Sequence, residues 1–316
     1  MAFDVSGLTA YVNQTSTELI GRAYFEAKSA DYFTLQAGIK SSEAIQLLSV
    51  QAYPQADTAC SFTASGTTTL TQRNITVGAI KYQDILCMKT LRAYWTQILL
   101  RSGSNDDSEV NEKMAQSVSD LLIKLVKENV EVLDWQGDTT SGDPLLNKYD
   151  GLIKLIDAGS PVDGNTAGIT VGTGITTGAS GNSDTIVYAM ADLRPAALKG
   201  ATDQVMFCGT DFFDGLVTTL IAKNNFHINA TDFANYEMTI PGRNIKLVGV
   251  NGLNGTNRLF TSYQSNFVLG VDMMNEEEEF KIWYSEDDDN VKYSIKFKRG
   301  VQVAYPSQIV EFTLVP

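Results

Sequence analysis

The clearest alternation of apolar and polar residues lies near the C-terminus, in two segments on either side of the acidic stretch SEDDDN. Every second position is large and apolar, first at Phe280, Ile282 and Tyr284, then at Val291, Tyr293, Ile295 and Phe297. A period of two predicts β-strands with one face toward a core. Two later apolar segments, VQVAY and IVEFTLV, are predicted to join the same sheet.

A different period marks residues 105–135. Apolar residues recur there at three-to-four spacing, at Val110, Met114, Val118, Leu121, Leu122, Leu125 and Val126. This stripe is typical of one face of an α-helix. Asp106 with Glu109 three residues later resembles a capping box, and it places negative charge at the helix start. We therefore predict one helix about 40 Å long. A shorter amphipathic helix is predicted at 16–28.

The region between these patterns mixes helices and strands. QVMFCG reads as a buried strand, and TDFFDGLVTTLIAKNN reads as a helix capped by Thr210 or Asp211. Further strands are predicted at NIKLVGV, NRLFTSY and NFVLGVDM, while residues 157–184 have the composition of a loop. The whole pattern predicts an α+β fold.

The segment from 54 to about 82 is polar and rich in threonine. Its few large apolar residues are Phe62, Leu70, Ile75 and Val77. Threonine and isoleucine favour strands and Gly66 favours a turn, so we predict an extended hairpin that follows a strand at 44–53. Such a hairpin buries little of its own surface and needs a partner surface to be ordered. A surface loop without regular structure is the alternative.

The composition and the net charge limit the classes of protein to which this chain can belong. Of 316 residues, 43% are hydrophobic and 19% charged, which is ordinary for a folded protein. The net charge of -13 repels phosphate, so direct nucleic-acid binding is not expected. The sequence shows no secretion signal and no apolar run of membrane-spanning length, so we expect synthesis in a cytoplasm. Cys60, Cys87 and Cys208 are widely spaced, so free thiols are expected.

Motifs for catalysis or cofactor binding are weak. Gly172, Gly174 and Gly178 do not have the dinucleotide-binding spacing, and His227 is the single histidine. Two acidic runs remain, at 276–279 and 286–289. Paired carboxylates serve glycoside hydrolysis or calcium binding, and a carboxylate-dependent glycosidase stays open as a remote alternative. A charged strip at a surface or interface is the favoured interpretation, and no cofactor or metal is predicted.

Two segments resemble tailed-phage capsid proteins of the Hong Kong 97-type fold. They are CSFTASGTTTLTQRNITVGAIKYQDILCMKTLRAYW and NFVLGVDMMNEEEEFKIWYSEDDDNVKYSIKFKRGVQVAYP. The resemblance extends over nearly the whole chain and includes proteins of crAss-like and related phages. It implies a structural shell protein with no enzymatic activity. An encapsulin-type nanocompartment shell is the nearest alternative.

The resemblance also implies a division of the chain. Residues 1–42 would form an N-terminal arm, 43–85 an extended E-loop, 86–144 the first part of the P domain with a spine helix at 106–135, 145–262 the A domain, and 263–316 the C-terminal P-domain strands. The E-loop would lie over a neighbouring subunit. Candidate intersubunit contacts are Arg73, Phe62, Glu276, Glu277, Glu278, Glu279, Glu286, Asp287, Asp288 and Asp289.

The resemblance to shell proteins also implies which partners this chain has. Copies of the chain would form pentamers and hexamers of an icosahedral virion capsid, made in the cytoplasm of a host bacterium. A portal and a decoration protein are further expected partners, and the shell would enclose DNA without sequence-specific binding. Family members often begin with a scaffolding segment that is removed. Here the arm starts almost at Met1, so a separate scaffolding protein is expected.

Overall fold

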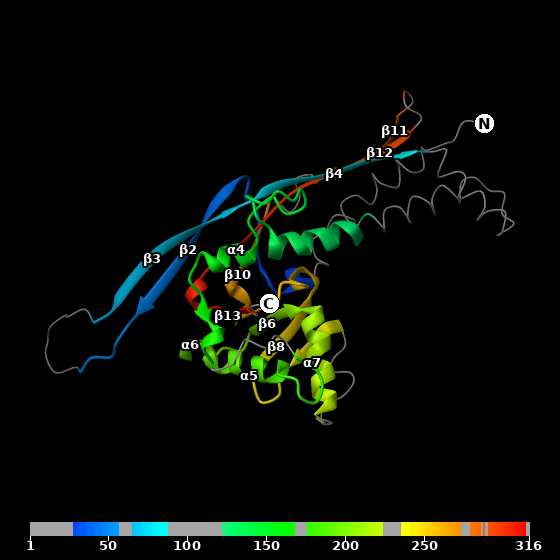
Figure 1. The fold of residues 1–316 in the computed structure, drawn as a ribbon. Coiled ribbons are helices and arrows are strands. Elements are labelled where there is room, and N and C mark those ends of the chain that lie inside the picture. The colour runs from blue at the N-terminus through cyan, green and yellow to red at the C-terminus, as the bar shows by residue number, and fades with distance from the viewer. Residues whose placement is uncertain are drawn as a thin grey trace.

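The computed structural model describes residues 28–56, 65–87, 122, 124–167, 176–223, 235–272, 279–285, 287 and 290–313. The protein is α+β, as predicted. A compact body of sheets and helices carries two long projections: a two-stranded hairpin on one side, and an extension of three strands toward the other (Figure 1).

The body is built around a six-stranded sheet. Its order is β5 (Val162–Asp163), β13 (Val310–Thr313), β9 (Arg258–Tyr263), β6 (Gln204–Gly209), β8 (Ile245–Val250) and β7 (Glu237–Thr239). Strand β6 is buried along its whole length, which explains its unbroken apolar sequence. Val205 and Phe207 pack on one face of the sheet, whereas Met206 and Cys208 pack on the other, beneath helices α5 (Ser183–Leu193) and α7 (Thr210–Ala222).

The second sheet contains the extension. It orders β1 (Thr34–Gln36), β10 (Phe267–Val271), β12 (Asn290–Val303) and β11 (Glu279–Ser285), with β4 (Gly78–Cys87) on the other side of β12. The predicted pair of alternating strands is confirmed: Phe280 is opposite Ile295, and Ile282 is opposite Tyr293. Tyr293, Ile295 and Phe297 are buried.

Two predictions about these elements were wrong. IVEFTLV does not join this sheet, because β13 pairs with β9 and β5 in the other one, whereas residues 301–303 of VQVAY do join it as the end of β12. Helix α7 begins at Thr210, so its N-cap is Gly209 and not a side-chain cap. The Thr210 hydroxyl instead donates to Asn254 Oδ1 at 2.9 Å, which attaches the helix start to the loop after β8.

A helix over residues 124–136 joins the two sheets, together with α4 (Leu152–Asp157) and the 3-10 turn η1 (Lys28–Tyr32). Trp135 lies at the centre of this core, fully buried, with its ring 5.1 Å from that of Phe207 and 5.7 Å from that of Phe260. The remaining short elements are α6 (Ala196–Lys199), η2 (Gly164–Ala167), η5 (Asn251–Leu253), η6 (Gln264–Asn266) and η7 (Pro306–Gln308).

An ion pair ties the end of this helix to β12. Arg299 and Asp134 are fully buried, and Arg299 Nη2 lies 2.6 Å from Asp134 Oδ2. The Tyr149 hydroxyl donates to Asp134 Oδ1 at 2.5 Å, so the carboxylate is bonded from two directions.

Several expectations fall on residues outside the described ranges. These are the helix at 16–27, residues 106–121 of the long helix, His227 and Cys60. The C-terminal end of the long helix agrees with the prediction to within one residue. Cys208 is a buried free thiol, and burial raises its pKa.

Candidate functional site

The most distinctive feature of the surface is the hairpin formed by β2 (Ser42–Gln51) and β3 (Thr67–Thr76). Ten residue pairs are in antiparallel register, from Ser42 opposite Thr76 to Gln51 opposite Thr67. At about 3.3 Å per residue the strands run for roughly 33 Å. The hairpin leaves the body at its root and extends well beyond it (Figure 1). An extended hairpin is thus present, but its first strand is the one predicted at 44–53, which pairs with residues 67–76 instead of preceding a separate hairpin.

The two faces of the hairpin differ. At its root one face meets the body: Ile75 is fully buried with Ile39, Val77 and Val268, and Leu47 is buried farther along. Side chains alternate between the faces of a strand, so the neighbouring positions face outward. The outward face carries the cross-strand pair Leu48 and Leu70, 59% and 64% exposed.

Val50 continues this outward apolar face and is 60% exposed. We call Leu48, Val50 and Leu70 the outward apolar face. Single exposed apolar residues are common, but three on one face of a projecting hairpin form a surface whose covering is favourable in free energy. Nothing within the described part of the chain covers it.

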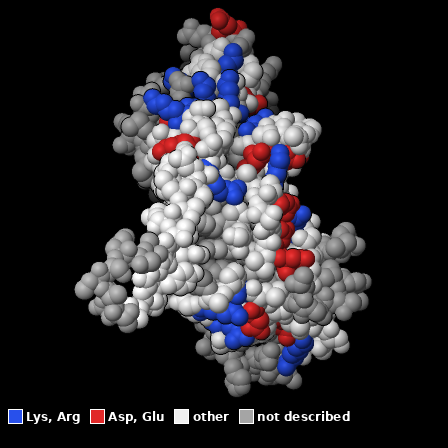
Figure 2. Space-filling model, turned by 90° about the vertical axis from the view of Figure 1, so that its left-hand side faces the viewer, with Lys and Arg blue, Asp and Glu red and all other residues white. Residues whose placement is uncertain are grey.

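Few charges lie on the hairpin. Glu43 and Arg73 are the charged residues of β2 and β3. Figure 2, which faces this side of the molecule, shows a broad white area with blue and red residues above and below it. A nearly uncharged strand pair with an exposed apolar patch suits contact with another protein surface better than binding of a charged ligand.

Two glycines allow the hairpin root to lie close to the sheet. Gly270 in β10 and Gly300 in β12 are direct cross-strand partners. A side chain at Gly300 would overlap the Thr76 carbonyl, and one at Gly270 would crowd Ile75. Sequence reasoning missed this site, although VLGVD and KRGVQ each place a glycine inside a strand, a known signal of close backbone approach.

Polar contacts then fix the direction of the hairpin. Gln302 Nε2 donates to the Asn74 carbonyl at 2.6 Å, and Arg73 Nη2 lies 3.5 Å from Gln302 Oε1. The Tyr305 hydroxyl reaches the Leu48 carbonyl at 3.4 Å. Burial lowers the pKa of the half-buried Arg73 guanidinium.

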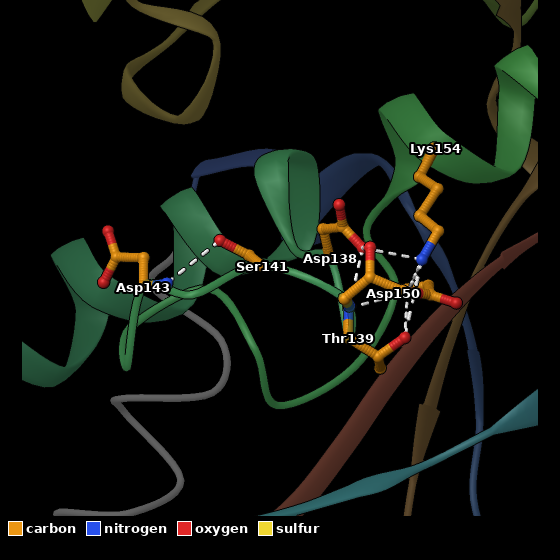
Figure 3. Close-up of polar contacts among 7 residues, drawn as sticks. Asp138, Thr139, Ser141, Asp143, Asp150 and Lys154 are labelled. Atoms are coloured by element: carbon orange, nitrogen blue, oxygen red, sulfur yellow. Dashed lines mark hydrogen bonds and ion pairs between the residues drawn. The ribbon is translucent and has the colours of Figure 1, made fainter.

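A loop at residues 137–150 lies beside this root. Lys154 Nζ is 2.7 Å from both Asp138 Oδ1 and Asp150 Oδ1, and the Thr139 hydroxyl donates to Asp150 at 2.8 Å (Figure 3). The hydrogen bond from Lys154 lowers the pKa of Asp138 to about 2. The loop continues to Lys148, whose carbonyl would overlap any side chain at Gly78, the first residue of β4.

The other predicted contact residues are only partly described. Phe62 and the acidic residues 276–278, 286, 288 and 289 lie outside the described ranges. Glu279 begins β11 opposite Lys296, and Asp287 is exposed in the turn before β12. Arg73 contacts Gln302 near the far end of β12, so the structure does not bring Arg73 and Asp287 together within one chain.

Basic side chains share one face of the extension. Lys296 is opposite Lys81, and Lys292 is opposite Trp283, which is 40% exposed. Figure 2 shows Lys and Arg gathered toward this end of the molecule. Along β12, Lys292, Lys296 and Lys298 alternate with the buried Tyr293, Ile295 and Phe297.

No metal-binding cluster of three or more His, Cys, Asp or Glu side chains occurs among the described residues. In the same part of the chain, no helix is long and apolar enough to cross a membrane.

This architecture, with a body, a projecting hairpin and a strand extension alongside a helix, is the Hong Kong 97-type fold of viral shell proteins. A chain of the satellite phage P4 procapsid matches with a TM-score of 0.62 at 12% identity, over 97% of this chain and 95% of that one. The capsid of Ralstonia phage GP4 matches at 0.53 and 10%, over 93% and 91%.

The capsid of cyanophage P-SCSP1u matches with a TM-score of 0.52 at 11% identity, over 89% of this chain and 86% of that one. No protein-family model and no curated protein matches the sequence. The relation to these shells is therefore one of fold.

Proposed function

We propose that this chain is the major capsid protein of a tailed bacteriophage, a structural subunit whose copies form the icosahedral shell around the phage DNA. The observation that carries the proposal is the projecting hairpin, whose outward apolar face is uncovered by the described part of its own chain. The shared fold with three phage shells supports the same conclusion and favours it over an encapsulin-type compartment.

The hairpin explains why one copy is an incomplete unit. An isolated two-stranded ribbon is marginally stable in water. Leu48, Val50 and Leu70 are each more than half exposed, and covering them contributes about 1–2 kcal/mol per side chain. A neighbouring copy is the natural cover, because closed symmetric assemblies repeat one contact around the whole ring.

Each segment of the chain has its own part in this shell subunit. Residues 1–42 are the N-terminal arm, 43–85 the E-loop, 86–144 and 263–316 the P domain, and 145–262 the A domain. The hairpin of β2 and β3 is the projecting part of the E-loop, and β4, which begins within the same segment, pairs with β12 of the P domain. Within each pentamer or hexamer, the hairpin of one copy lies over a neighbouring copy.

Further partners belong to the same proposal. A portal, a separate scaffolding protein and a decoration protein would complete the virion, and synthesis takes place in the bacterial host. The net charge of -13 supports a shell that encloses DNA without holding it, since like charges repel.

The test compares two double variants on the outward face. Leu48→Ser with Leu70→Ser removes the apolar pair, while Gln46→Ser with Gln72→Ser changes the adjacent polar pair of the same face. We expect both proteins to fold with unchanged melting temperatures. Sedimentation velocity and electron microscopy should show at least a tenfold loss of assembly for the leucine variant alone.

Equal assembly by both double variants would contradict the role of the hairpin. A wild-type chain that stays monomeric, whether expressed alone or with the products of its neighbouring genes, would contradict the shell function itself.

A further inference from the structure

The carboxyl group of Glu131 is buried where η1 lies on the helix over 124–136. The Glu131 side chain is 5% exposed, and Ser29 of η1 and Trp135 one helical turn later are fully buried. A buried acid is rare unless it is paired, because burial removes the water that stabilises the charge.

The hydrogen bonds around Glu131 are incomplete. The backbone N–H of Ser29 donates to the carboxylate. Among the described residues, however, Glu131 Oε1, Ser29 Oγ and Trp135 Nε1 have no hydrogen-bond partner. Unpartnered buried polar atoms raise the free-energy cost of placing a charge on the Glu131 carboxyl.

The charged groups that face Glu131 do not neutralise it. Arg299 from β12 is engaged by Asp134, with distances of 2.6, 3.0 and 3.2 Å. Asp134 is a like charge on the same helix, and Lys28 of η1 donates to the Asn235 carbonyl. Burial therefore dominates, and it raises the pKa of Glu131 to about 7, with Asp134 adding to the rise.

We propose that Glu131 is a pH-sensitive switch that controls how firmly residues 28–31 are held against the helix. A neutral carboxyl is compatible with the closed contact. An ionised carboxyl favours states in which these residues separate from the helix and water reaches the charge. The inference rests on contacts within one subunit, so it stands or falls independently of the proposed shell function.

The structure also limits how far the separation extends. Tyr32, at the end of η1, is buried with its ring 5.9 Å from that of Phe207. Strand β1 follows directly and pairs with β10. These contacts hold the chain from Tyr32 onward, so the separation among the described residues is limited to 28–31.

The direction of the pH dependence follows from linkage. The closed state binds the proton more tightly than an open state in which Glu131 has its ordinary value of 4.5. Closure is therefore strongest below that value and weakens as pH rises through about 7. Each pH unit in this window changes the equilibrium tenfold, so the total change is on the order of 100-fold.

Amide hydrogen exchange measured by mass spectrometry on the full chain tests the switch. After correction for intrinsic exchange, opening of residues 28–31 should increase about 100-fold in the wild type between roughly pH 5 and 8.5. Glu131→Gln should abolish this dependence. Glu128→Gln, an exposed position on the same helix, is the matched control and should behave as the wild type.

The same pH dependence in Glu131→Gln as in the wild type would overturn the proposal. If Glu131→Gln does not fold, the wild type alone tests the switch. Amide exchange at residues 28–31 is then compared with amide exchange in α4. A ratio of these two rates that stays constant with pH rejects the switch.

Discussion

Arg299 and Asp134 form a fully buried, two-point ion pair, with Nη2–Oδ2 at 2.6 Å and Nε–Oδ1 at 3.0 Å. The pair connects the long helix to β12 one residue before Gly300, which accommodates the hairpin root. The planar guanidinium fixes the helix in one orientation relative to the strand. The core and the hairpin root are therefore both held by one short stretch of β12, at Arg299, Gly300 and Gln302.

Breaking this pair should be costly. Asp134→Ala leaves the Arg299 charge buried and should lower the free energy of unfolding by about 3–5 kcal/mol in urea titrations. The control is Asp192→Ala, because Asp192 and Arg243 form an exposed pair at 2.6 Å. Its loss should cost less than about 1 kcal/mol. If Asp134→Ala and Asp192→Ala lowered the free energy of unfolding equally, burial of the ion pair would not be the reason for the loss of stability.

Charge reversal at Arg73 tests the contact predicted between the hairpin and an acidic run of a neighbouring copy. Arg73→Glu would place like charges together, so the yield of assembled particles should fall at low salt and recover in part at high salt, where repulsion is screened. Arg73→Gln removes the charge without reversing it and should have a smaller effect. Assembly of Arg73→Glu as good as wild type at every ionic strength would reject the contact.

The loop held by Lys154 should respond to acid in a defined way. The pKa of Asp138 is lowered to about 2, chiefly by its hydrogen bond from Lys154. The stabilisation is thus present above the ordinary value of 3.8 and is lost as pH falls through about 2.

Lys154→Met should therefore lower the melting temperature by a small, constant amount between about pH 5 and 8, and by less below about pH 3. Scanning calorimetry measures this, with the exposed Lys148→Met as control. If the difference in melting temperature between Lys154→Met and the wild type grew as the pH fell, the stabilising contact between Lys154 and Asp138 would be contradicted.

Local elements of the fold were predictable because they depend on short-range patterns. The continuous apolar sequence QVMFCG predicted β6, and the alternation around Ile295 predicted the pairing of β11 with β12. The polar hairpin was predictable for a different reason, since its sequence favours strands yet cannot bury itself. The pattern of one segment carries these signals without reference to any other part of the chain.

The partner of β13 was not predictable in this way. An apolar strand satisfies its backbone hydrogen bonds in any sheet, and its pairing with β9 is decided by how the chain turns at η7. The same holds for Gly270 and Gly300, whose importance depends on Thr76 and Ile75 arriving from far along the chain.

The sequence by itself therefore determined the class of fold, most of its strands and the need of the hairpin for a partner, because periodicity and composition are local properties. Only the tertiary structure decided which hairpin face is outward and where the Glu131 carboxyl is buried. Burial depends on distant segments: Glu131 looks like any polar position of a helix until η1 packs over it.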